Sequence, residues 1–210
     1  MPLFRHDGRL IYFSHIPKTG GSSVENALKD AGAKRAMLQS KARTVELGYG
    51  KCSPQHIHAE VALGFFPKGF FDYTFCTIRN PYDRIASEYK MKAAGSKDDP
   101  GPDIWITAAL NQLRKFAYSR DNHIRPQRAF IMRDMAVFRL EDGLDKPISA
   151  ALGALGLAAD VDIPRHRESA KGPLTVTRDT LNLIQSTYAK DFAQLDYALD
   201  SYDTAFTLSD

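Results

Sequence analysis

Residues 10–23 read LIYFSHIPKTGGSS, and this stretch decides the predicted fold. Residues 10–13 are a short apolar run rich in β-forming side chains, which predicts a buried strand. A turn containing proline and glycine follows. Residues 22–31 then predict a helix, because their apolar side chains fall on one face, and Gly32 ends it. The stretch is therefore a strand, a glycine-containing turn and a helix in succession.

This order is the usual geometry for holding a phosphate, because the first helical amides and the helix dipole face the anion. Gly20 and Gly21 allow a close backbone approach, Lys18 adds a positive charge, and Ser22 and Ser23 add hydroxyl donors. A Walker A loop places its lysine after the last glycine, whereas Lys18 precedes both glycines. The strict triphosphatase template therefore fails. An ordinary turn with Ser22 as helix cap is the alternative reading.

A second candidate anion site follows the clearest predicted strand, residues 73–78. Arg79 stands at the carboxyl end of this strand, where ligands bind in open α/β sheets. Pro81 then opens a helix, and Ser87 lies two turns into it. An arginine with paired donors and a helix hydroxyl suit a second phosphate. The alternative is that Arg79 or Arg84 pairs with acidic neighbours on the surface.

The rest of the chain alternates strands with helices, which predicts an α/β fold with a parallel sheet covered on both faces. A length of 210 residues suits a single domain, 1–210, better than two independent ones. The other expected elements are helices at 61–66, 104–118, 144–155 and 180–192, strands at 129–132 and 137–140, and loops at 95–102 and 164–173. Residues 33–55 are expected to be loops with one short strand.

The composition, 43% hydrophobic and 25% charged, is ordinary for a soluble protein. A net charge of +3 suits an anionic ligand but is too weak to indicate nucleic acid. No run of about 18 apolar residues predicts a membrane span. The two cysteines, Cys52 and Cys76, cannot form a disulfide framework, so we expect a reducing, cytoplasmic setting.

The two motifs together resemble the sulfotransferase superfamily. Residues 15–21, HIPKTGG, are similar to the 5′-phosphosulfate loop of carbohydrate sulfotransferases, including the heparan sulfate 2-O type. The 3′-phosphate motif Arg-x-Pro-x-x-Arg-x-x-Ser-x-Tyr is matched by Arg79, Pro81, Arg84, Ser87 and Tyr89. Weaker resemblance continues through residues 123–127, 140–142 and 188–192. It implies a three-layer, P-loop NTPase-like fold with a central parallel β-sheet flanked by helices.

The resemblance implies a sulfuryl transfer from 3′-phosphoadenosine-5′-phosphosulfate (PAPS) to a hydroxyl or amine, without a metal, leaving 3′-phosphoadenosine-5′-phosphate (PAP). Lys18 would stabilise the leaving phosphate. Arg79 and Ser87 would hold the 3′-phosphate, and Lys171 or Arg167 of a late basic loop would also contact the donor. The cradle for the 5′-phosphosulfate would consist of Pro17, Lys18, Thr19, Gly20, Gly21, Ser22 and Ser23.

The acceptor needs a base, and histidine suits proton removal near neutral pH. His56-Ile57-His58 lacks a helical zinc-binding spacing, which disfavours a metal site. In the carbohydrate branch a similar His-x-His carries the base, which implies His58 as the base and His56 as a supporting catalytic residue. His15 is expected to be structural. His123 and His166 are the alternatives.

The expected acceptor is a sugar, and we expect no nucleic-acid partner. Since the chain is compact for the family, the acceptor cleft is expected to be shallow and open, or completed by a second copy in a homodimer. Two other functions stay open. A P-loop small-molecule kinase would require magnesium and ATP, and a non-catalytic nucleotide-binding protein would keep Lys18 and Arg79 without needing His58.

Overall fold

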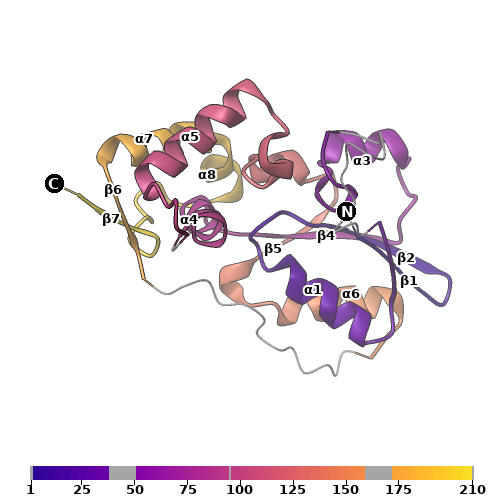
Figure 1. Cartoon of the computed structure of the whole chain (residues 1–210). Coiled ribbons are helices and arrows are strands. Elements are labelled where there is room, and N and C mark those ends of the chain that lie inside the picture. The colour runs from indigo at the N-terminus through magenta and orange to yellow at the C-terminus, as the bar shows by residue number, and fades with distance from the viewer. Residues whose placement is uncertain (1, 38–50, 95, 159–171, 210) are drawn as a thin grey trace. The chain divides into compact units, whose positions relative to one another are not determined.

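The computed structural model describes residues 2–37, 51–94, 96–158 and 172–209. The chain is α/β and divides into two compact units (Figure 1). Unit 1 comprises Met1–Ile78 and Ala129–His166, and unit 2 comprises Arg79–Arg128 and Arg167–Asp210. The hydrophobic side chains form one cluster in each unit. The prediction that residues 1–210 form a single domain stays a prediction.

Unit 1 contains a five-stranded sheet in the order β3-β1-β2-β4-β5. Its strands are β1 (Leu3–His6), β2 (Arg9–Ser14), β3 (Lys34–Ala36), β4 (Tyr73–Ile78) and β5 (Ala136–Arg139). The strands β2, β4 and β5 are parallel, as predicted.

The prediction of a parallel sheet holds only for these three strands, because β1, on the other side of β2, runs antiparallel to β2 and β3. The reason is a tight hairpin before β2. Asp7 and Gly8 both have positive φ, at 49° and 83°, which is the backbone of a two-residue hairpin turn. This turn reverses the direction of the chain, so β1 pairs antiparallel with β2, the next strand in the sequence.

The two faces of this sheet are covered differently. Helices α1 (Gly21–Asp30) and α6 (Asp145–Leu155) pack together against one face (Figure 1), where Ile11 and Phe13 join their apolar side chains in the core. On the opposite face Tyr12 stacks on Phe71 at 5.2 Å between ring centroids. Since both faces of β2 are buried, the strand reads as a continuous apolar run.

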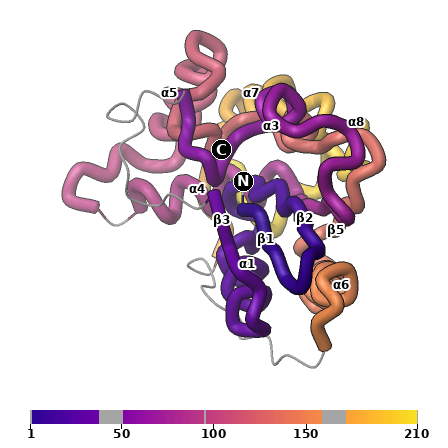
Figure 2. The backbone as a smooth tube through the Cα atoms, turned by 90° about the vertical axis from the view of Figure 1, so that its right-hand side faces the viewer, coloured from indigo at the N-terminus to yellow at the C-terminus, as the bar shows by residue number. Residues whose placement is uncertain are grey.

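Unit 2 is mainly helical (Figure 2). Its helices are α4 (Pro81–Lys92), α5 (Pro102–Lys115), α7 (Arg178–Thr187) and α8 (Ala189–Leu195), and they surround one apolar core. A parallel pair of short strands, β6 (Leu174–Val176) and β7 (Phe206–Leu208), adds a second sheet.

The remaining described elements are short. Helix α3 (Ala59–Phe65) and the 3-10 turns η1 (Pro54–His56) and η4 (Leu140–Asp142) belong to unit 1, and η2 (Ser119–Asn122) belongs to unit 2. The 3-10 turn η3 (Gln127–Phe130) spans the boundary between the units. Among the described residues, no helix has the length and apolar character needed to cross a membrane.

Most predicted elements are confirmed, with two corrections. The predicted strand at 129–132 is wrong, because η3 occupies its first residues, and a four-residue apolar run has no period that separates strand from turn. The predicted helix at 180–192 is interrupted at Tyr188, whose ψ of 19° ends α7 and begins α8.

Candidate functional site

The loop between β2 and α1 in unit 1 has the backbone expected for anion binding. Lys18 and Gly20 both have left-handed φ, at 72° and 83°, and Gly20 is the N-cap of α1. The amides of Ser23 and Val24 donate to the Gly20 carbonyl at 3.0 and 3.3 Å, which starts the helix. The amides of Gly21 and Ser22 have no acceptor within α1, because no helical carbonyl lies four residues before them, and such first-turn amides point out of the helix N-terminus. The structure therefore places Gly20 as cap, not Ser22.

A buried ion pair between His15 and Glu25 packs against Gly21 of this loop. His15 Nδ1 bonds Glu25, and Gln55 and Arg35 also donate to the Glu25 carboxylate, at 3.0 and 3.1 Å. Burial alone would raise the pKa of Glu25, but the bonds and charges of these neighbours bring it below its ordinary value. A Cβ added to Gly21 would lie 2.7 Å from His15 Cε1. The glycine is therefore needed for close packing against His15, whose structural role stays a prediction.

The other predicted cradle residues divide into two groups. Thr19 is fully buried, and its hydroxyl donates to the Ile16 carbonyl at 2.8 Å and lies 3.0 Å from Thr77 Oγ1. Its side chain therefore ties the loop to the end of β4. Pro17 and Ser23 are also buried, whereas Ser22 is exposed and Lys18 is half-buried. Lys18 and Ser22 are thus the polar side chains of the loop with access to a ligand.

The two predicted catalytic histidines occupy different environments in unit 1. His56 ends η1, and its ring meets the His15 ring edge-on at 5.3 Å between centroids. His58 is the N-cap residue of α3, and its Nε2 lies 3.7 Å from the Glu60 carboxylate. Both are buried. The structure brings His56 against the ion pair that supports Gly21, a contact that the sequence did not indicate.

The second motif lies in unit 2, at the start of α4. The Asn80 side chain caps the helix by accepting from the Tyr82 amide at 3.0 Å. Asp83 and Ser87 lie four residues apart and so share one face of α4, whereas Arg79 precedes the helix cap. Arg79 lies 4.0 Å from Asp83, and Ser87 is buried at 4% exposure.

The alternative that places Arg84 on the surface is wrong. Its side chain is buried, and NH2 donates to the His123 carbonyl at 2.6 Å. An arginine in this position organises the interior of unit 2. Arg79, with 23% of its side chain exposed, is the arginine of the motif with access to a ligand.

Lys90 is a basic residue near this face that sequence reasoning missed. Burial lowers the pKa of Lys90, the Arg79 charge lowers it further, and Asp83 opposes this effect. Its Nζ donates to the Gly172 carbonyl at 2.6 Å. The sequence could have indicated Lys90 as a further basic residue of this site, because it follows Ser87 by three residues on a predicted helix, where such residues are neighbours.

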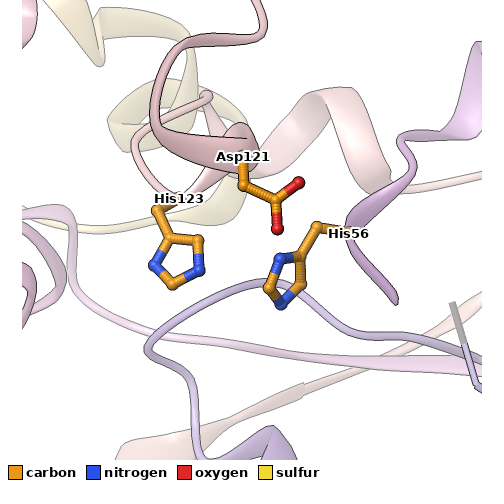
Figure 3. A group of neighbouring side chains, drawn as sticks. All are labelled: His56, Asp121 and His123. Carbon is orange, nitrogen blue, oxygen red and sulfur yellow. The ribbon is translucent and has the colours of Figure 1, made fainter. Parts of the chain in front are cut away.

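The alternative base His123 also has a defined partner. Its Nδ1 lies 2.9 Å from Glu88, whose carboxylate is fully buried. A carboxylate at one ring nitrogen orients the other nitrogen, which is the arrangement of a general base. Figure 3 shows His123 beside Asp121, which also belongs to unit 2. The preceding residues 120–122 have left-handed φ of 53°, 55° and 62°, a strained backbone of the kind found at functional sites.

The remaining predicted residues, Lys171, Arg167 and His166, lie outside the described residues. An open groove of unit 2 between α5 and the start of α7 includes neither Arg79 nor Ser87. Comparison of the chain with protein-family models, curated proteins and solved structures finds no match.

Proposed function

We propose that the protein is a PAPS-dependent sulfotransferase of the carbohydrate type, with a P-loop-like three-layer fold. The observation that carries the proposal is the backbone of the loop at 15–21. Three features support a 5′-phosphosulfate site there: left-handed Lys18 and Gly20, a glycine packed against a buried histidine, and the N-terminus of a ten-residue helix.

The order of the two motifs along the sheet supports the same proposal. The strands β2 and β4 are parallel neighbours, and Ser14 pairs with Cys76 near their carboxyl ends. The phosphate loop follows β2 in the chain, and Arg79 follows β4. Ligands of open α/β sheets bind beyond the carboxyl ends of the strands. PAPS carries one phosphate at the 5′ position and another at the 3′ position of its ribose, and the two motifs offer one candidate anion site for each.

In the proposed reaction, an acceptor hydroxyl attacks the sulfur of PAPS in line with the bond to the 5′-phosphate. The new oxygen–sulfur bond forms as the old one breaks, and PAP leaves. Lys18 offsets the charge that develops on the leaving phosphate. The acceptor proton passes to a histidine, for which His58 is the proposed base and His56 the supporting residue.

Titration calorimetry with PAP in the absence of magnesium tests the proposal. We expect binding that does not change when EDTA is added, and weaker binding by Lys18→Ala. Binding of magnesium-ATP without binding of PAP would instead support a small-molecule kinase. Sulfuryl transfer from PAPS to a panel of polysaccharides then separates an enzyme from a non-catalytic nucleotide-binding protein.

A further inference from the structure

The backbone of Arg79 is held on both sides by one side chain. Gln127 Oε1 accepts from the Arg79 amide at 2.9 Å, and Gln127 Nε2 donates to the Arg79 carbonyl at 2.7 Å. Gln127 is fully buried. Only one orientation of its amide satisfies both bonds, because the oxygen must face the N–H and the nitrogen must face the carbonyl. The glutamine therefore fixes both peptide groups of Arg79.

Asp191 holds the glutamine in turn. One oxygen of its carboxylate accepts from the Gln127 amide at 2.7 Å, and the other accepts from the Arg128 amide at 3.0 Å. Asp191 is fully buried in α8, more than 60 positions further along the chain. Burial raises the pKa of Asp191, whereas the two amides and the Arg84 charge favour its ionised form. A chain of hydrogen bonds thus runs from α8 through Gln127 to Arg79, entirely within unit 2.

The two bonds satisfy the backbone N–H and C=O groups of Arg79 where β4 has ended, and they also hold the residue in one orientation. The residue follows a strand and precedes the capped start of α4, so the chain there is already defined by Asn80. What the two extra bonds add is a fixed direction for the Cα–Cβ bond of Arg79. For a side chain that binds a phosphate through paired donors, a displacement of about 1 Å weakens both bonds.

We propose that Gln127 and Asp191 are positioning residues that aim Arg79 at the 3′-phosphate of the nucleotide, and so set the preference for a 3′-phosphorylated donor. This inference rests on the proposed function. The two residues act through the Arg79 backbone and do not touch the nucleotide. Gln127→Glu keeps the acceptor for the Arg79 amide and removes the donor to its carbonyl. Asp191→Asn keeps the size of the side chain and loses one of the two accepted amide bonds.

The experiment measures the dissociation constants of PAP and of adenosine 5′-phosphate, which lacks the 3′-phosphate, by calorimetry. The readout is the dissociation constant of adenosine 5′-phosphate divided by that of PAP, which measures the preference for the 3′-phosphate. We expect Gln127→Glu to reduce the ratio about tenfold, the equivalent of about one charge-assisted hydrogen bond, with adenosine 5′-phosphate binding unchanged. Asp191→Asn provides a second, independent variant and should shift the ratio in the same direction.

Tyr188→Phe is the matched control. It removes a buried hydrogen bond of 2.8 Å from Tyr188 to the Ile124 carbonyl, near Asp191 in the chain, and leaves Arg79 untouched. It should lower the melting temperature without changing the ratio. If the Gln127 and Asp191 variants also lose stability while keeping the wild-type ratio, the positioning role is overturned and the proposed function stands. A wild-type protein that binds both nucleotides equally overturns both.

Discussion

Gly21→Ala tests whether the buried histidine shapes the phosphate loop. An added Cβ would lie 2.7 Å from His15 Cε1, closer than side-chain carbons pack. The imidazole has little freedom to withdraw, because His15 is bonded to Glu25, which Gln55 and Arg35 hold in place. Either the ring or the start of α1 must move.

The magnitude follows from two opposing effects. Overpacking of a buried site costs about 1–3 kcal/mol. Replacing glycine by alanine within a helix contributes up to about 1 kcal/mol in the other direction, and less in the first turn. We therefore expect a net loss of about 1–2 kcal/mol in the free energy of unfolding, which lowers the melting temperature by about 3–6 °C for a chain of this size.

Urea unfolding and calorimetry with PAP are the assays. PAP binding should weaken as well, because the Gly21 amide moves with the helix start. The control is Gly153→Ala in α6, where an added Cβ meets no atom within 4 Å, and this variant should be neutral or slightly stabilised. The reasoning is refuted if the Gly21→Ala loss is as large in a His15→Ala background as in the wild type, since the clash is then not its cause.

Four further variants, all in unit 1, give testable predictions. Lys18→Gly should stabilise the protein by up to about 1 kcal/mol in thermal unfolding, because glycine adopts the φ of 72° at position 18 without the backbone strain that lysine has there. The variant should also lose sulfuryl transfer, since the lysine charge is gone. A less stable variant would contradict the assignment of backbone strain to Lys18. Glu25→Gln should unfold more easily near neutral pH. The folded pKa of Glu25 is lowered, so its stabilisation is present above the ordinary value of 4.5 and disappears as the pH falls through the lowered value. Urea midpoints of wild type and variant should therefore converge in acid, and a constant difference would oppose this assignment. His58→Ala should abolish sulfuryl transfer and keep PAP binding, and normal turnover by this variant would show that His58 is not the base. His56→Ala should reduce both transfer and PAP binding, because the His56 ring packs against His15 next to the phosphate loop.

Local patterns were sufficient to predict the elements that present the candidate site. The strand at 73–78 is confirmed with its predicted bounds, and Pro81 opens the following helix. These signals are short-range, because side-chain periodicity and the missing proline donor act within a few residues. The glycines and Lys18 could likewise be assigned to a turn from their order alone.

The tertiary structure decided the contacts between distant positions. The sequence showed neither the antiparallel β1 nor the bond between Gln127 and Arg79, which lie 48 positions apart. It also gave no sign that Arg84 is buried, since an arginine on an amphipathic helix ordinarily faces water.

The loop at 15–21 illustrates the division between the two. The sequence by itself determined that a strand, a glycine turn and a helix follow one another there. Only the fold determined why Gly21 must be a glycine, because His15 reaches it while bound to Glu25 within α1. The physical reason is that helix and strand propensities are properties of neighbouring residues, whereas close packing and buried ion pairs depend on how the whole chain is arranged.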